Sequence, residues 1–293
     1  MEFFFEVLIG GLLSGVMYSL VALGFVLIFK ASGVFNFAQG AMVLFAALTF
    51  VGLLEHGFAI WAAAIATIVT MVVLAIVVER LVLRPLVNQE QIIMFMATIG
   101  IAYFLNGIGQ AMWGADVHPL MLGIPQGPVD VLGIQIDKFD LIAAAVAGSL
   151  VAGLAFFFQK TRIGRALRAV ADDHQAAMSV GIPLKQIWVI VWTAAGIVAF
   201  VAGIMWGSNL GVQFSVALVA LKALPVLILG GFTSIPGAIV GGLLVGAGEK
   251  LSEVFLGPFV GGGIETWFAY MLAMLFLMVR PQGLFGERII ERV

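Results

Sequence analysis

The chain has 293 residues, of which 62% are apolar and only 10% are charged, and its formal net charge is −2. A soluble domain is about 45–50% apolar and about 25% charged, so a single soluble core cannot hide this much apolar surface. The small net charge and the lack of a basic cluster interleaved with aromatic residues argue against a nucleic-acid partner. Because the chain has no cysteine, disulfides and thiolate metal sites are excluded.

The apolar residues form continuous runs of about 20 residues, the length of a transmembrane α-helix. A membrane β-barrel would instead need alternating strands of roughly 10 residues. We therefore predict an all-α fold, a polytopic integral membrane protein with eight or nine transmembrane helices in a single domain over residues 1–293. The N-terminal segment Met1–Glu6 lacks the basic region of a cleaved signal peptide, so we expect the first run to remain as a helix.

The predicted spans are separated by short polar segments. Uninterrupted runs lie over Val7–Phe29, Phe37–Leu54, Phe58–Val78, Ile92–Trp113, Phe139–Phe158, Ile187–Gly207 and Ile264–Val279. The stretch Phe214–Leu251 is also apolar, but glycines and a proline interrupt it over Gly230–Gly237. It is either two short crossings or one crossing with a re-entrant piece, which leaves the total at eight or nine.

Lysine and arginine predict the orientation, because short cytoplasmic loops carry an excess of them. These residues gather in the linker 159–186 and in the tail after the last span, whereas the loop 114–138 has one lysine and three aspartates. The basic segments share one side if the N-terminus is outside and the C-terminus is cytoplasmic. That arrangement requires an odd number of crossings, which favours two crossings within Phe214–Leu251 or one helix that fails to span. We place 159–186 in the cytoplasm and 114–138 outside.

Glycines recur four residues apart on several predicted helices, as in Gly11/Gly15, Gly237/Gly241 and Gly242/Gly246. This spacing lets helix backbones approach closely in lipid. We interpret it as tight packing within the bundle, with a subunit interface as the alternative.

The sequence lacks the common short motifs of nucleotide-binding and catalytic sites. The sequence has no GxxxxGK[ST], GxSxG, HExxH or CxxC, so we predict that the chain is not an enzyme and binds no cofactor itself. Lys222 is the one charge inside an apolar stretch that stands out. It either extends its ammonium to the membrane surface or has a structural or pathway role.

Neutral amides within the apolar runs are candidates for a substrate passage. Asn36 and Gln39 flank Phe37 and share a helix face, as do Asn106 and Gln110. Amides in lipid need partners, so each pair either makes interhelical hydrogen bonds or lines a wet passage, and both interpretations stay open. We predict Asn36, Phe37, Gln39, Asn106 and Gln110 as the passage residues.

The linker 159–186 combines helix-forming alanine, leucine and arginine with a stop at Gly181 and Pro183. The pattern predicts a short amphipathic helix. The segment is either a solvated connection on the cytoplasmic side or a docking element for another protein. Its segment from Gln175 to Gly181 reads QAAMSVG and resembles the EAA loop of ABC importer permeases, with Gln in place of Glu.

Four motifs in order make the chain similar to the LivH-type family of branched-chain amino acid permeases. GVFNFAQG over Gly33–Gly40 resembles the family's NFA[HQ]G signature, and the linker and the glycine-rich region 229–242 resemble two further family motifs. The ending RPQGLFG over Arg280–Gly286 matches the fourth. The resemblance covers nearly the whole chain.

This resemblance implies an inner (plasma) membrane ABC importer in which the chain pairs with a second, LivM-type permease. Two ATPase subunits bind ATP on the cytoplasmic side, and an external solute-binding protein delivers the solute, which crosses by alternating access. The linker would supply the ATPase-coupling loop, formed by Arg165, Arg168, Asp172, Gln175, Ala176, Ala177 and Gly181.

Branched-chain amino acids are the expected solutes, with urea or short amides as the alternative within the same family. An ion-coupled carrier is the competing class, suggested by Lys222 and the amides within the spans.

Overall fold

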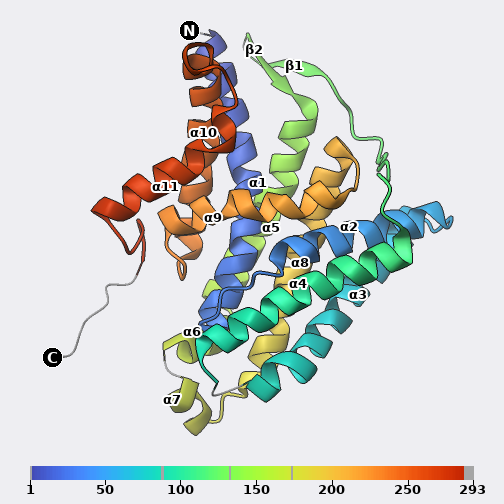
Figure 1. Cartoon of the computed structure of the whole chain (residues 1–293), viewed down its shortest axis with the longest axis vertical. Helices are drawn as coiled ribbons and strands as arrows, with labels where there is room; N and C mark the ends of the chain where they lie inside the picture. Colours follow the sequence, from blue (N-terminus) through green and yellow to red (C-terminus); the bar gives the residue numbers. More distant parts are fainter. Residues whose placement is uncertain (1, 87–88, 132, 173, 287–293) are drawn as a thin grey trace. The chain divides into compact units, whose positions relative to one another are not determined.

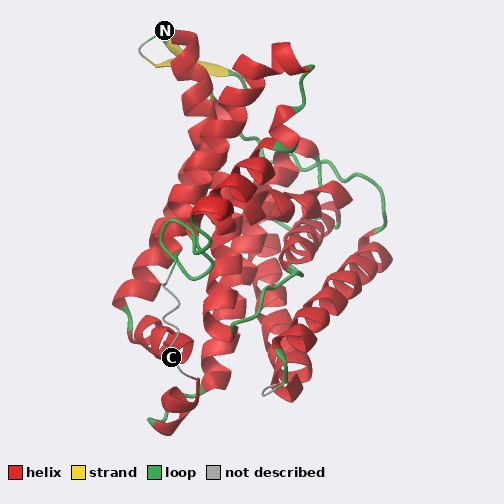
Figure 2. Ribbon diagram, turned by 60° about the vertical axis from the view of Figure 1, so that its left-hand side comes forward, coloured by secondary structure: helices red, strands yellow, loops and turns green. Residues whose placement is uncertain are grey.

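The structure is a computed structural model that describes residues 2–86, 89–131, 133–172 and 174–286. Helices make up almost all of it, and one short hairpin supplies its strands (Figures 1 and 2). The helices are α1 (Glu2–Ser32), α2 (Gln39–Glu55), α3 (Ile60–Val78), α4 (Gln91–Trp113), α5 (Lys138–Lys160), α6 (Arg162–Asp172), α7 (His174–Ser179), α8 (Leu184–Leu210), α9 (Val219–Gly230), α10 (Ile235–Val260) and α11 (Phe268–Val279). A π-helical turn (Glu79–Leu83) and a 3-10 turn (Arg84–Leu86) extend α3, and further 3-10 turns precede α9 (Phe214–Leu218) and α11 (Ile264–Thr266). The all-α prediction is confirmed.

Two compact units make up the chain. Unit 1 consists of Met1–Val26, Gly123–Val151 and Leu221–Val293, and unit 2 of Leu27–Leu122 and Ala152–Ala220. Each unit therefore collects segments that lie far apart in the sequence. The prediction of a single permease domain over 1–293 stays a prediction.

Helix α2 is the core of unit 2. It packs against α8, α4 and α3, and its residues from Gln39 to Gly52 are all buried. A helix that is apolar on every side must be covered all round by protein or by lipid, and over Gln39–Gly52 protein neighbours cover α2. Gly203 on α8 makes one of these contacts close, because a Cβ there would lie 2.6 Å from the Val43 carbonyl oxygen of α2.

Glycines bring α1 and α10 together in unit 1. A Cβ on Gly11 would lie 2.8 Å from the Gly246 carbonyl oxygen, and one on Gly15 would meet the backbone of Gly242. Conversely, Gly242 and Gly246 face the backbone of α1. Backbones that approach this closely exclude any larger residue at the contact. The packing interpretation of the spaced glycines is confirmed at these positions.

The apolar stretch after residue 213 folds as two helices bent by 116° at the predicted break. Gly231 takes a φ of +101°, a left-handed conformation that glycine adopts at little cost. The Ser234 hydroxyl then caps α10 by accepting a hydrogen bond from the Gly237 amide at 3.0 Å. The break is thus a turn followed by a capped helix start.

Five helices in the described part of the chain are long and apolar enough to cross a membrane, and the bent pair makes six if it counts as one span. Helices α2 and α11 are shorter, with 17 and 12 residues. At 1.5 Å per residue, α11 reaches about 18 Å, well short of the roughly 30 Å hydrocarbon core. The chain is a multi-pass membrane protein, and a total of eight or nine crossings stays a prediction.

Segment 114–138, which we predicted as a loop, contains a β-hairpin whose strands are too short to appear as long apolar runs. Strands β1 (Pro128–Val131) and β2 (Ile134–Asp137) pair antiparallel in unit 1. Gly133 has a φ of +84°, and its amide donates to Asp130 Oδ1 at 2.8 Å. The signal was present in the sequence, because alternating apolar and polar residues flank this glycine.

Candidate functional site

The connection between α1 and α2 holds the first predicted amide pair. Asn36 and Gln39 are both 0% exposed. Asn36 Nδ2 donates to Gln39 Oε1 at 3.3 Å, and Gln39 Nε2 donates to the Ala195 carbonyl of α8 at 3.4 Å. Asn36 Oδ1 also accepts from the Ala38 amide at 3.1 Å. The pair therefore forms a buried hydrogen-bond network within unit 2.

Phe37 separates the two amides and differs from them in exposure. Its ring lies edge-on to Phe95 of α4 at a centroid distance of 6.1 Å, yet the residue is 43% exposed. Its amide donates to Thr98 Oγ1 at 3.0 Å, and that hydroxyl lies 2.8 Å from the Phe95 carbonyl. Thr98 was not among the predicted site residues, because its only signal in the sequence is a hydroxyl within a largely apolar run.

Gly40 ends the GVFNFAQG motif in the first turn of α2. A Cβ at this position would overlap the Ala217 carbonyl oxygen and would lie 2.9 Å from Ala220 Cβ. The 3-10 turn Phe214–Leu218 packs directly on α2 here. The glycine of the motif is therefore explained by a backbone contact.

The second amide pair is not joined to the first by any hydrogen bond that the structure records. Asn106 is half-buried, and its Oδ1 is buried without a hydrogen-bond partner in the described part of the chain. Gln110 is exposed. The passage role of all five residues stays a prediction.

The linker 159–186 folds as α6 and α7, which confirms the predicted amphipathic helix. Gly164, Leu167 and Val170 form the buried face of α6. Thr161 caps this helix, because its Oγ1 accepts from the Gly164 amide at 3.2 Å. The cap fixes the start of α6, and the buried face packs the helix against the rest of unit 2.

Two arginines of α6 have different surroundings. Arg168 donates from its guanidinium to the carbonyls of Phe158 at 2.8 Å and Gln159 at 3.4 Å, at the end of α5. These carbonyls lack partners within the helix, so the arginine satisfies groups that a helix end leaves open. Arg165 lies one turn earlier and is exposed. Of the two, Arg165 presents its charge outward.

Helix α7 carries the segment that resembles the EAA loop. Ala177 is 3% exposed and belongs to the packed side, and the side chain of Gln175 lies outside the described part of the structure. Gly181 takes a φ of +84°, and its amide donates to the Met178 carbonyl at 3.0 Å. Gly181 therefore ends the helix with a left-handed residue.

The exposed residues of the linker named below are together called the linker face. Its apolar members are Met178, which is 47% exposed, and Val180, which is 77% exposed. Its polar or small members are Arg165, Asp172 and Ala176, all exposed. Exposed apolar side chains in a segment that also exposes charged residues are a candidate for a protein contact.

Lys222 lies in a charged cluster of unit 1. Its ammonium is 3.5 Å from Tyr18 Oη and 3.9 Å from Glu249 Oε2. Tyr18 and Glu249 are almost fully buried, at 5% and 3% exposed. Burying a carboxylate without a cation is costly, so the lysine stabilises Glu249 inside unit 1. The ion pair with Glu249 therefore supports a structural role for Lys222.

In the described part of the chain, no group of three or more His, Cys, Asp or Glu residues is placed to hold a metal ion. The candidate sites are therefore a buried amide network and an exposed linker face, which suit packing and contact.

Comparison with known proteins agrees with this description. A family model described as "Branched-chain amino acid transport system / permease component" matches residues 7–280. The high-affinity branched-chain amino acid transport system permease protein BraD of Pseudomonas aeruginosa is 28% identical, with 99% of this chain and 98% of BraD covered. The corresponding LivH of Escherichia coli has the same identity and coverage.

A more distant relative is the probable branched-chain amino acid transport permease protein LivH of Methanocaldococcus jannaschii. It is 27% identical, and the match covers 96% of this chain and 92% of that protein. Among solved structures, PsaBC from Streptococcus pneumoniae in complex with Fab has a chain with a TM-score of 0.50 over 94% of this chain and 92% of its own. At 14% identity this likeness concerns the fold alone.

Proposed function

Because the chain belongs to the family of permease components of branched-chain amino acid transport systems, we propose that it is the transmembrane permease subunit of an ATP-driven importer for branched-chain amino acids. The near full-length relatives in bacteria and an archaeon are described as permeases for these solutes, which supports the solute class. The chain moves the solute by alternating access and hydrolyses no ATP itself.

The proposed topology places the N-terminus outside and the C-terminus in the cytoplasm of the inner membrane. The excess of lysine and arginine in 159–186 and in the C-terminal tail supports this orientation. An odd total of crossings is needed, and eight or nine were predicted. Nine follow if both α9 and α10 cross and the short α2 and α11 are counted as spans.

The linker face is the observation that carries the proposed mechanism. Met178 and Val180 expose apolar side chains on a segment that is otherwise rich in charge. When a partner protein covers exposed apolar groups of this kind, their removal from water lowers the free energy of the complex. The resemblance of α7 to the EAA loop supports an ATPase subunit as that partner, and closure of the ATPases would then push on α6 and α7.

The remaining partners follow from the same family. We propose a second, LivM-type permease, two ATPase subunits and an external solute-binding protein, with ATP bound only in the ATPases. The solute passage would involve Asn36, Phe37, Gln39, Asn106 and Gln110. Because Asn36 and Gln39 are fully buried here, they would reach the solute only in another conformation of the permease.

The test is ATPase binding and coupling after Val180→Asp. A buried carboxylate at a docking contact is strongly unfavourable, so the variant should bind the ATPase subunits at least tenfold more weakly. It should also lose hydrolysis stimulated by the loaded solute-binding protein. The matched control is Val131→Asp on β1, because Val131 is also exposed and lies in the segment proposed to be outside. Normal ATPase binding and coupling in Val180→Asp would overturn the docking role.

Solute class is tested separately in liposomes that contain the full transporter. Uptake of leucine should need internal ATP, and isoleucine and valine should compete with it. Competition by urea or short amides, with no effect of isoleucine or valine, would support the alternative solute class. Uptake driven by an ion gradient through this chain alone would overturn the proposed importer.

A further inference from the structure

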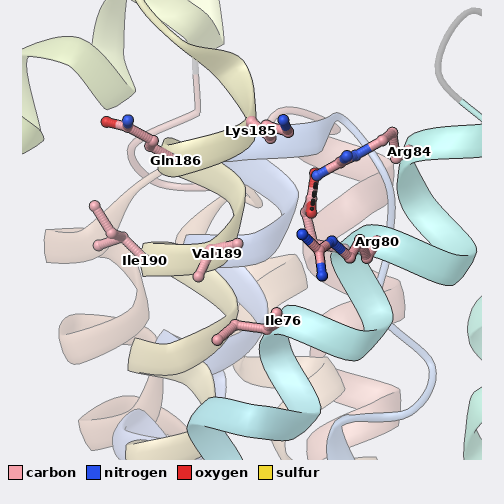
Figure 3. Close-up of a pocket in the computed structure, with 8 residues that line it drawn as sticks. Ile76, Arg80, Arg84, Lys185, Gln186, Val189 and Ile190 are labelled. Carbon is pink, nitrogen blue, oxygen red and sulfur yellow. Dashed lines mark hydrogen bonds and ion pairs between the residues drawn. The ribbon is translucent and has the colours of Figure 1, made fainter.

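A groove of about 450 Å³ lies within unit 2, where the end of α3 passes the start of α8. Figure 3 shows side chains from both helices around it. Lys185 and Arg84 lie at its upper end in that view, and Ile76 lies at its lower end. The groove therefore has a cationic end and an apolar end.

One of its arginines is already neutralised. Arg84 donates to both oxygens of Glu79, from Nε at 3.1 Å and from Nη2 at 2.8 Å. Glu79 is 3% exposed, so this bidentate pair is part of the packed wall. It adds no net charge to the groove.

Two further cations line the same groove. Arg80 and Lys185 are exposed, and the structure records no ion pair for either among the described residues. With Glu79 and Arg84 cancelling, the groove carries two net positive charges. A net positive charge of this kind attracts anions.

The apolar end continues along the outside of α3. Val69, Val73 and Ile76 are 54%, 52% and 39% exposed, and their spacing places them on one helix face. Arg80 follows Ile76 by one further turn. Of the most apolar 18-residue window of Ile60–Leu86, only 22% is buried within the chain, so much of α3 is left uncovered by the chain's own residues. The face therefore changes from apolar to cationic at the end of the span.

Helix α8 repeats this order from the other side of the groove. Lys185 is followed one turn later by Val189, and Gln186 by Ile190. Both helices therefore place polar side chains at one end of the groove and apolar side chains one turn further toward its other end. The proposed orientation puts that end at the cytoplasmic surface of the membrane, where headgroup phosphates lie.

We propose that this groove binds an anionic phospholipid, whose phosphate is held by Arg80 and Lys185 and whose acyl chain lies along Val69, Val73 and Ile76. Arginine suits the phosphate because its planar donors match the phosphate oxygens, and lysine adds a point charge. Basic pockets between membrane helices bind anionic headgroups for the same reason. A zwitterionic lipid has an ammonium of its own and would leave the two charges unmatched, so the site selects anionic lipids.

The test measures phospholipid binding to the purified full chain by native mass spectrometry, with phosphatidylglycerol compared with phosphatidylcholine. Wild type should bind phosphatidylglycerol more tightly. The double variant Arg80→Gln/Lys185→Gln should bind it about 25-fold more weakly, from roughly fivefold per basic residue at a membrane surface. The control Lys160→Gln/Arg162→Gln removes the same charge from exposed residues of the same linker region and should keep wild-type binding.

Further variants separate the two ends of the site. Arg80→Lys should bind phosphatidylglycerol more weakly than wild type but more tightly than Arg80→Gln, because the charge remains while the planar pair of donors is lost. Val73→Asn should weaken long-chain phosphatidylglycerol but leave dihexanoyl phosphatidylglycerol unchanged, because only the long chain reaches that residue.

Three outcomes would overturn the proposal. The first is equal binding of the two headgroups by wild type. The second is an equal loss of affinity in the control double variant, which would indicate a general charge effect. The third is full competition by inorganic phosphate at millimolar concentration, which would make the ligand a free anion. Because the assay contains no ATPase or solute, its failure is distinct from failure of the proposed transport function.

Discussion

The segment Gly33–Gly40 and the linker 159–186 carry the most specific motifs of the chain, but they use their polar groups in opposite ways. In the first segment, Asn36 and Gln39 are fully buried and bond to each other and to α8. In the linker, Arg165 and Asp172 are exposed, and so are the apolar Met178 and Val180. A buried motif that satisfies itself stabilises the fold, whereas an exposed one remains available for a partner. Burial therefore separates two kinds of motif that look equally functional in the sequence.

The largest expected effect is at Gly40, in the buried motif. Gly40→Val should lower the free energy of unfolding by about 3 kcal/mol or abolish folding, because its Cβ would overlap the Ala217 backbone. Gly100→Val is the control, since a Cβ there meets nothing within 4 Å. Thermal unfolding in detergent measures both variants. Equal stability of the two would contradict the close contact between α2 and the 3-10 turn.

A pair of identical substitutions tests the buried network. Asn36→Leu should cost about 2 kcal/mol, because it leaves Gln39 Oε1 and the Ala38 amide without their partner in a buried site. Asn106→Leu should be neutral or stabilising, because Asn106 Oδ1 has no partner to lose in the described structure. The same thermal assay applies. Transport should follow stability in Asn36→Leu, and a stable variant with no transport would instead favour the passage role.

The two arginines of α6 separate stability from contact within the linker itself. Arg168→Met should cost about 1.5 kcal/mol, because the carbonyls at the end of α5 lose a charged donor. Arg165→Met should change stability by less than about 0.5 kcal/mol, as expected for an exposed side chain. Unfolding is measured together with binding of the ATPase subunits. We expect Arg165→Met to weaken that binding, and the idea of an outward contact fails if only Arg168→Met does so.

The smallest expected effect concerns the hydroxyl that supports Phe37. Thr98→Val should cost about 1 kcal/mol, because the Phe37 amide loses its acceptor on α4. Thr70→Val is the matched control, since the Thr70 hydroxyl bonds to the Ala66 carbonyl of its own helix at 2.9 Å. A larger loss in the control would show that Thr98 does not hold the connection between α1 and α2.

Much of the architecture was accessible from the sequence, because it depends on local pattern. Long apolar runs predicted the helices, and the glycine and proline break predicted the interruption that appears as a 116° bend. The alanine, leucine and arginine residues of the linker, with the stop at Gly181 and Pro183, predicted the amphipathic α6. The hairpin at 128–137 was not predicted, because strands of four residues with alternating apolar and polar side chains do not form a long apolar run.

The sequence by itself determined that the chain is helical, belongs in a bilayer and carries two conspicuous polar motifs. Only the tertiary structure decided the direction in which each motif faces. Gln39 bonds to the Ala195 carbonyl, and Arg80 lines the same groove as Lys185, in both cases across more than a hundred residues of sequence. Helical periodicity reports which residues share a face, but it carries no information on what covers that face. Burial, the satisfied network and the cationic groove therefore arise only when distant segments pack together.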